Sequence, residues 1–296
     1  MTKINSKRII LLILIALLAF SCALLVPSVH ADTGPKPSVV IEFKNMDDRL
    51  CYGTLLSKYE STGPASAWDG DENHIWCNDD NLSVWRAFVG YEDEDGYFYL
   101  QWHWRVDESK ELAWTYYPPS PFKILLYYPD TDSFQVSGVI EKYAFHSYYS
   151  VDMSNGLDEV EQTLPVEVNY QYGKEIAWLI VRIILTILIE LGIAWMFKLR
   201  SKKEILTILG VNTVTQIALN IALNVLNFYN GLWALIWYIP LELGVFIVES
   251  VVYCLTLRKM RQPEYSNGYC VLYTFCANVI SFAVGAIMAI FISGLF

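Results

Sequence analysis

The sequence predicts an α+β protein in which a β-rich extracytoplasmic domain precedes a four-helix transmembrane bundle. Two observations lead to this fold class. The long apolar runs are confined to residues 9–26 and 176–296. Residues 32–174 are instead polar, aromatic and acidic, with 25 Asp and Glu against 10 Lys and Arg. A chain that is 54% hydrophobic and so unevenly divided is typical of a membrane protein with an exported domain.

The charge of the acidic segment limits the partners that it can bind. Negative charge repels both nucleic acid and anionic lipid, so we expect neither as a partner of residues 32–174. The remainder of the chain is basic, with 6 acidic and 11 basic residues.

Residues 1–31 have the organisation of a secretory signal peptide, in which a basic start and an apolar core precede a small-residue cleavage site. The features are Lys3, Lys7 and Arg8, the core 9–26, the helix breaker Pro27, and Val29 and Ala31 before a mature start near Asp32. The apolar core is long for a signal peptide, so an uncleaved membrane anchor is the alternative. Both interpretations place residues 32–174 outside the cytoplasm.

Residues 32–151 are predicted to form β structure, as a sandwich or a small barrel. The predicted strands lie in 38–43, 122–128 and 134–151, where β-branched and aromatic residues are frequent. The turn dipeptide Asp95-Gly96 predicts a hairpin across residues 84–106. Residues 152–175 are acidic and are predicted to be a linker or stalk.

The second arm of the predicted hairpin has two faces, because side chains alternate along a strand. The core face is expected to contain Phe98, Leu100, Trp102, Trp104 and Val106. The other face is half aromatic and is expected to be covered too; it contains Tyr97, Tyr99, Gln101, His103 and Arg105. The aromatic residues of this segment could also form a platform on which sugars stack, although core packing explains most of them.

Two further features of the exported segment suggest local structure. Cys51 and Cys77 are its cysteines, and an exported pair predicts one disulfide, with two buried thiols as the alternative. The acidic run 92–96 resembles part of a calcium loop but lacks ligands at the first and last positions. We therefore predict a solvated turn there.

Four later apolar runs are long enough to cross a bilayer, which takes about 20 helical residues. They cover about 176–199, 204–227, 232–257 and 269–296. The connectors 198–203 and 258–262 are basic, so the positive-inside rule places them in the cytoplasm. The chain is expected to be a multi-pass protein of the cell membrane, with residues 32–175 and its C-terminus extracytoplasmic.

The predicted membrane helices carry many polar side chains. Glu242 and Glu249 lie seven residues apart and share one helix face to within about 20°. The candidate intramembrane polar site comprises Arg182, Glu190, Asn212, Gln216, Asn220, Glu242 and Glu249. Counting from the helix ends gives three depths: Glu190, Gln216, Glu242 and Ser281 in the middle, Glu249, Asn212 and Asn278 nearer the cytoplasm, and Arg182 and Asn224 nearer the outside.

Three glutamates and one arginine cannot all be ionised in a dry bundle, because a charge at the bilayer centre costs at least about 2.5–3.5 kcal/mol. One glutamate is expected to pair with Arg182, and the others to be protonated, hydrated or bound to a cation. Two interpretations remain open. The residues form a proton, cation or substrate site, or they are hydrogen-bonding groups that hold the helices together.

Sequence motifs of membrane enzymes are missing. The chain contains no H-E-x-x-H, no G-x-S-x-G and no Walker A sequence. We therefore predict no catalytic, cofactor-binding or metal-ligating residue, and a non-enzymatic role is the leading expectation.

Several segments resemble a group of uncharacterised Gram-positive multi-pass membrane proteins. They are 51–64, 91–101, 116–129 and 141–145, together with "NTVTQ" and "LELGVFIVE" in the membrane helices. The resemblance covers the whole chain and implies a signal peptide and a β-rich extracytoplasmic domain before the membrane helices. It implies no activity and transfers no site residue.

The expected function is that of a non-enzymatic accessory or sensor subunit of the cell envelope. Its ectodomain would bind an external ligand or partner, and its bundle would pair with another membrane protein or a second copy of the chain. The alternative is a proton- or cation-linked transport component that uses the intramembrane Glu and Asn residues.

Overall fold

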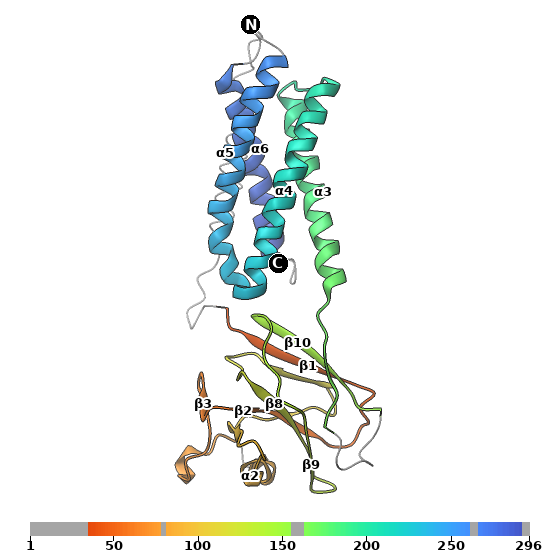
Figure 1. Cartoon of the computed structure of the whole chain (residues 1–296), viewed down its shortest axis with the longest axis vertical. Helices are drawn as coiled ribbons and strands as arrows, with labels where there is room; N and C mark the ends of the chain where they lie inside the picture. Colours follow the sequence, from red (N-terminus) through yellow and green to blue (C-terminus); the bar gives the residue numbers. More distant parts are fainter. Residues whose placement is uncertain (1–34, 78–80, 155–162, 261–265, 292–296) are drawn as a thin grey trace. The chain divides into compact units, whose positions relative to one another are not determined.

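A computed structural model of the chain describes residues 35–77, 81–154, 163–260 and 266–291, so the predicted signal peptide lies outside the described residues. The chain divides into a β-rich unit, Pro35–Tyr170, and a helical unit that begins at Gln171 (Figure 1). This division confirms the predicted α+β fold class, in which long apolar helices follow a region of sheets.

One sheet of the β-rich unit has the strand order β11-β10-β1-β7. Its strands are β1 (Ser38–Lys44), β7 (Glu111–Trp114), β10 (His146–Asp152) and β11 (Val166–Val168). The central pair, β1 and β10, is parallel, with Ser38 opposite His146, whereas the outer pairs are antiparallel. The first and last long strands of the domain are therefore neighbours.

The second sheet is antiparallel and centres on β2 and β8, with β9 beyond β8 and both β5 and β6 pairing with β2. Its strands are β2 (Tyr52–Ser57), β5 (Phe98–Tyr99), β6 (Trp104–Arg105), β8 (Phe122–Tyr128) and β9 (Ser133–Val136). A small separate hairpin is formed by β3 (Ser61–Thr62) and β4 (Ala65–Ser66).

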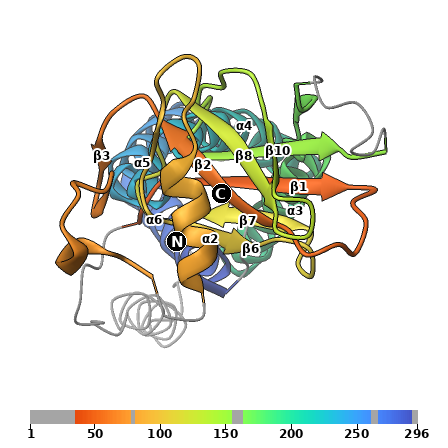
Figure 2. The same ribbon diagram turned by 90° about the horizontal axis from the view of Figure 1, so that it is seen from below.

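The two sheets pack face to face around a hydrophobic core, so the domain is a β-sandwich. Ile124 and Leu126 of β8 point into this core, whereas Leu125 between them belongs to a second cluster on the other face. Helix α2 (Leu82–Gly90) covers that second face and lies in front of β2 and β8 in Figure 2. Because both faces are covered, every residue of β8 is buried, which explains its continuous apolar sequence.

The first arm of the predicted hairpin across 84–106 is wrong, because residues 82–90 form α2. Val84, Trp85 and Phe88 are buried on one side of this helix, at spacings that a helix brings together. The predicted turn at Asp95-Gly96 is confirmed: the Gly96 N–H donates to the carbonyl oxygen of Asp93 at 3.0 Å.

The second arm follows the predicted faces only in part. Leu100 and Val106 are fully buried, but Phe98 is 37% exposed. Tyr97 and Tyr99 are covered, as expected, and their cover is the cluster under α2. Trp102 and Trp104 pack against the same core as Leu100 and Val106, as predicted. Gln101 has a φ of 64°, in the left-handed region that non-glycine residues rarely adopt.

The predicted linker 152–175 is too long, because Leu164 is buried in the sandwich core and β11 pairs with β10. The sandwich extends to Tyr170, and the first membrane helix begins at Tyr172. Residues 166–168 of this acidic segment thus form a strand because they pair with the edge of the sheet.

The predicted disulfide between Cys51 and Cys77 is not formed. Cys51 is a fully buried thiol in the core between the sheets, whereas Cys77 packs in the cluster under α2 on the other side of the second sheet. Burial raises the pKa of Cys51 to about 12, so its thiol stays protonated and unreactive at neutral pH.

The acidic turn 92–96 contains a buried ion pair. The prediction of a solvated turn is correct for Asp95, whose side chain is 62% exposed, but not for Asp93. The Lys123 ammonium lies 2.8 Å from Asp93 and 2.6 Å from Asp95, and the Lys123 and Asp93 side chains are 6% and 1% exposed. Asp93 also accepts hydrogen bonds from the backbone N–H groups of Asp95 and Tyr97. Burial alone lowers the pKa of Lys123, but the bonds to the two carboxylates outweigh it and the net pKa is raised.

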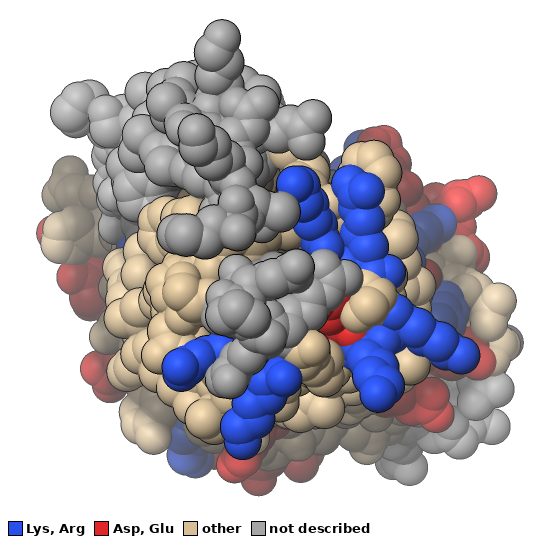
Figure 3. Space-filling model, turned by 90° about the horizontal axis from the view of Figure 1, so that it is seen from above, with Lys and Arg blue, Asp and Glu red and all other residues tan. Residues whose placement is uncertain are grey.

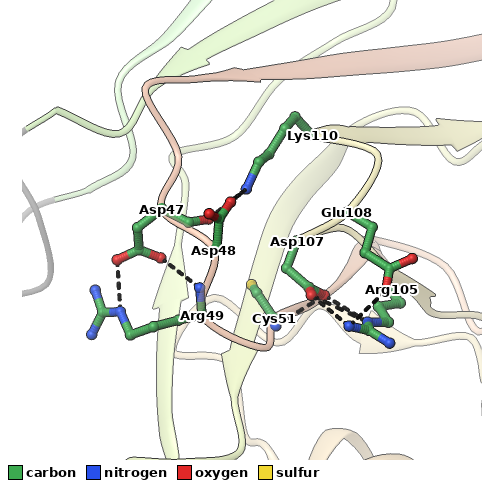
Figure 4. A network of polar contacts seen from close by, with 8 residues as sticks. All are labelled: Asp47, Asp48, Arg49, Cys51, Arg105, Asp107, Glu108 and Lys110. Atoms are coloured by element: carbon green, nitrogen blue, oxygen red, sulfur yellow. Dashed lines mark hydrogen bonds and ion pairs between the residues drawn. The ribbon is translucent and has the colours of Figure 1, made fainter.

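A second polar network fixes the entry to β2 (Figure 4). Asp107 accepts two bonds from the Arg105 Nε at 3.0 and 3.2 Å and one from its NH2 at 2.8 Å, and it also accepts from the Cys51 N–H. Lys110 bonds Asp48 at 2.8 Å. These bonds tie the loop before β2 to the loop after β6, and Arg105 holds the pKa of Asp107 below its usual value.

Four described helices are long and apolar enough to cross a membrane, which confirms their number as predicted. They are α3 (Tyr172–Met196), α4 (Lys202–Asn230), α5 (Leu235–Met260) and α6 (Asn267–Phe291), with the short η3 (Gly231–Ala234) between α4 and α5. α3 packs against α4 and α6, and α5 packs against the same two helices, so α3 and α5 lie on opposite corners of the bundle.

One end of the bundle is strongly basic. Figure 3 shows Lys and Arg side chains around this end, where α3 connects to α4 and α5 ends. The exposed cations at this end of the described helices are Lys198, Arg200, Lys202, Lys203, Arg258 and Lys259. A capping box begins α4 here: the Ser201 side chain accepts from the Glu204 N–H, and Glu204 accepts from the Ser201 N–H.

Candidate functional site: the polar interior of the membrane bundle

The interior of the helical unit holds a group of buried polar side chains contributed by all four long helices. Glutamates come from α3 and α5, amides from α4 and α6. Glu190, Glu249 and Asn212 are each 0% exposed. A hydrophobic bundle needs none of these groups for membrane insertion, so each one requires a local explanation.

Glu249 of α5 has a complete set of neutral donors. The Thr215 hydroxyl of α4 donates to its Oε1 at 2.7 Å, and the Asn278 amide of α6 donates to its Oε2 at 2.7 Å. The Thr215 hydroxyl also lies 3.1 Å from the carbonyl oxygen of Val211, one turn earlier. Glu249 therefore links three helices through its two oxygens.

Glu190 of α3 reaches toward the same place from the opposite corner of the bundle. Its charged and amide neighbours are Glu249, Asn212 and Glu242. The Asn212 amide is the hydrogen-bonding neighbour of its carboxylate, and the Asn212 Nδ2 makes no other hydrogen bond among the described residues. One neutral donor is a weak partner for an ionised carboxylate, which the low-dielectric interior strongly disfavours.

Two tyrosines adjoin the Glu190–Glu249 pair on its side toward the basic end. The Tyr253 hydroxyl donates to the Asn212 Oδ1 at 3.4 Å, and the Tyr273 ring packs 5.6 Å from that of Tyr253. Both tyrosines are fully buried and belong to an apolar cluster with Phe197 and Leu257. This cluster separates the acid pair from the basic end of the bundle.

Glu242 of α5 faces two other spaces. One is a cavity of about 20 Å³, which offers room for about one water molecule. Its polar lining consists of Arg182, Thr186, Gln216, Asn220, Tyr238, Glu242 and Ser281. The other is an apolar groove of about 300 Å³ between α5 and α6, in which Glu242 and Asn278 are the polar residues.

Several residues that were predicted to lie at the same depth in the membrane are neighbours in the structure. Gln216, Glu242 and Ser281 meet around the small cavity. The Arg182 guanidinium NH2 donates to the Asn224 amide oxygen at 3.0 Å, at the outer predicted depth. Glu190 differs, because it lies with Asn212 and Glu249 and does not line the cavity. Asn220 bonds the Gln216 carbonyl of its own helix at 2.8 Å.

Four residues that complete the site were not among the predicted site residues: Thr215, Tyr238, Tyr253 and Tyr273. A signal for two of them exists on α5, where positions 238, 242, 249 and 253 are spaced by four, seven and four residues and share one face. Tyr273 and Thr215 carry no such signal, because aromatic and hydroxyl residues are ordinary components of membrane helices.

Within the described ranges, no group of three or more His, Cys, Asp or Glu side chains could hold a metal ion. The pair Glu190–Glu249 is suited to holding a proton, because protonation of one carboxylate removes one of two like charges from the dry interior.

Comparison with known proteins identified no relative: no family model, no curated protein and no solved structure matches the chain.

Proposed function

We propose that this chain is a proton-responsive sensor or accessory subunit of a cell envelope membrane. The bundle is integral to the membrane, the basic end faces the cytoplasm, and the β-sandwich and the C-terminus are extracytoplasmic. The charge distribution supports this orientation, because the exposed Lys and Arg gather at one end of the bundle and positive connectors stay inside.

The observation that carries the proposal is the buried pair of Glu190 and Glu249 on diagonally opposite helices. Two carboxylates this close in a dry interior cannot both be ionised, so at least one is protonated in the packed bundle. Loss of that proton places like charges between α3 and α5. The packing of the helices then depends on the protonation of one pair.

The titratable groups in electrostatic contact with the pair are Glu242 and Tyr253 of α5 and Tyr273 of α6. The facing residues of α4 are amides and a hydroxyl. Arg182 of α3 is bonded to Asn224. A change in the charge of the pair is therefore not compensated by a cation among these neighbours.

A sensor requires an output, and the described connectors at the basic end are short. The helices α3 and α4 are separated there by residues 197–201. We infer that the signal leaves through a membrane partner or a second copy of the chain that contacts the lipid-facing side of the bundle. Affinity capture from native membranes that returns this chain alone, together with a monomeric mass in native mass spectrometry, would contradict this part of the proposal.

The test of the proton site is thermal unfolding of the full-length protein in nanodiscs from about pH 5 to about pH 9. A carboxyl that is neutral in the bundle and ionised in the unfolded chain stabilises the bundle at low pH, and this stability is lost as the pH rises. Glu190→Gln and Glu249→Gln should each flatten the pH dependence. Glu175→Gln, on the first turn of α3 and about 22 Å along the helix from Glu190, is the matched control.

The outcome that overturns the proposal is a wild-type pH profile in both glutamine variants. A profile that also depends on the identity of the cation would replace the proton by that cation as the bound species. Repeating the titration in Na⁺, K⁺ and Mg²⁺ salts distinguishes the two cases.

A second candidate function is proton- or cation-linked transport. The favouring observation is the small cavity, whose polar lining includes Arg182 and Glu242 and lies beside the acid pair. Proteoliposomes with a pH-sensitive dye test it: wild type should dissipate an imposed proton gradient and Glu242→Gln should not. Equal leak from wild type, the variant and empty liposomes leaves only the sensor role.

A further inference from the structure

The β-sandwich contains an open pocket of about 710 Å³ whose walls combine indole rings with amide and imidazole groups. Its walls include Trp76, Asn81, Gln101, Trp102, His103 and Trp104. They come from the two segments on either side of residues 78–80, and from the chain between β5 and β6. A volume of this size accommodates a small organic ligand.

Gln101 builds the floor of the pocket. Its side-chain oxygen accepts from the Trp76 N–H and from the Trp85 indole N–H, both at 3.2 Å, and its amide donates to the Ser66 carbonyl at 3.3 Å. The residue is 2% exposed and has the left-handed φ noted above. An unfavourable backbone conformation is thus maintained by three bonds, and it fixes the position of Trp76.

Three tryptophans line the pocket. Trp76 is 44% exposed, and Trp102 and Trp104 are half-buried, with their rings perpendicular to each other. Both Trp102 and Trp104 pack 5.3 Å from the fully buried Trp114. These two rings are already fixed and lose little conformational freedom when a ligand packs against them, whereas the Trp76 ring is open to stacking.

Two polar groups of the wall have hydrogen-bonding capacity for a ligand. The Tyr99 hydroxyl lies 2.6 Å from the His103 Nδ1, and which of the two donates depends on the imidazole tautomer. Burial lowers the pKa of His103 to about 4, so the imidazole is neutral at pH 7. Because Tyr99 bonds Nδ1, Nε2 is the ring nitrogen left to bond a ligand, as donor or as acceptor. Asn81 occupies the N-cap of α2, but its side chain makes no capping bond.

The charge around the pocket restricts the ligand. The segment leading into it carries Asp69, Asp71 and Glu72, all exposed, and residues 32–174 as a whole are strongly acidic. Anionic ligands such as nucleotides and acidic sugars are repelled by this surface. A neutral saccharide has apolar C–H faces that stack on indole rings and hydroxyls that bond amides and imidazole.

We propose that this pocket binds a neutral oligosaccharide, stacked on Trp76 and hydrogen-bonded by His103 and Asn81. This site is independent of the proposed proton site in the bundle. Either can be wrong without affecting the other, because they share no residue.

The test uses the full-length protein in nanodiscs and three neutral probes, maltohexaose, cellohexaose and chitohexaose, each up to about 10 mM. At least one should change tryptophan fluorescence in a saturable manner and give matching heat in calorimetry. Trp76→Ala should weaken that binding at least about tenfold. Tyr59→Ala removes a more exposed aromatic ring outside the pocket, 63% exposed, and should bind as wild type does.

Unchanged melting temperatures of both variants exclude unfolding as the cause of lost binding. The proposal is overturned if none of the three probes gives a saturable signal, or if Trp76→Ala binds as tightly as wild type. Tighter binding of hexagalacturonate than of the neutral probes also overturns it, because the ligand would then be anionic. Glu190→Gln and Glu249→Gln serve as folded controls with wild-type sugar binding.

Discussion

Replacing Lys123 with methionine tests whether the ion pair at residues 92–96 stabilises the sandwich. Methionine fills a similar volume but leaves Asp93, which is 1% exposed, without its cation. Removing one partner of a buried ion pair costs about 3–5 kcal/mol. Asp93 keeps the N–H donors of Asp95 and Tyr97, so the lower end, about 3 kcal/mol, is expected. For a domain of this size the melting temperature should fall by about 10 °C.

The assay is thermal unfolding of the full-length protein in nanodiscs, followed by near-ultraviolet circular dichroism. Lys58→Met is the matched control, because Lys58 is exposed and bonds only the carbonyl oxygen of Asp95 among the described residues, at 3.2 Å. The double variant Lys123→Met with Asp93→Asn should recover more than half of the lost stability, since the unpaired charge is then absent. A melting temperature for Lys123→Met within about 2 °C of the Lys58→Met value would refute the reasoning.

Three further predictions concern other parts of the chain. Acidification should destabilise the sandwich by roughly 2–3 kcal/mol, because the stability that neutral His103 contributes above about pH 6.5 is lost as the pH falls toward its folded pKa of about 4. His103→Gln should flatten this part of the profile of unfolding free energy against pH. Gly285→Ala should lower the melting temperature of the bundle by an amount equivalent to about 1–3 kcal/mol, because its new methyl group meets the Tyr238 hydroxyl. Gly244→Ala adds a Cβ with nothing within 4 Å and should leave the melting temperature unchanged. Ser201→Ala should cost about 1 kcal/mol of bundle stability in the same assay, through loss of the α4 capping box.

The membrane helices were predictable because their information is local. A run of about 20 apolar residues has few alternatives, and basic connectors mark its ends. The strand 122–128 was equally predictable, because β8 is covered on both faces and its sequence is continuously apolar. The segment 82–90 was not, since Val84, Trp85 and Phe88 favour strands in isolation, and only the sheet face that they cover makes a helix the better packing.

The candidate site was likewise predictable only where the information is local to one helix. Helical spacing alone puts Glu242 and Glu249 on one face. The partners of Glu249 depend on how α4 and α6 rotate against α5, which a single helix sequence does not encode. The same limit applies to Glu190, whose neighbours lie across the bundle.

The pairing of β1 with β10 has a consequence for how the sandwich is made. Ser38 and His146 are 108 residues apart, yet their strands form the centre of one sheet. β1 is synthesised before β10, and the edge of β1 that pairs with β10 has no neighbour until residues 146–152 have followed. Such long-range contacts slow folding and leave a strand edge open to aggregation in the meantime. We therefore expect folding of the sandwich to depend on protection of this β1 edge, and a truncation before residue 146 to yield insoluble protein.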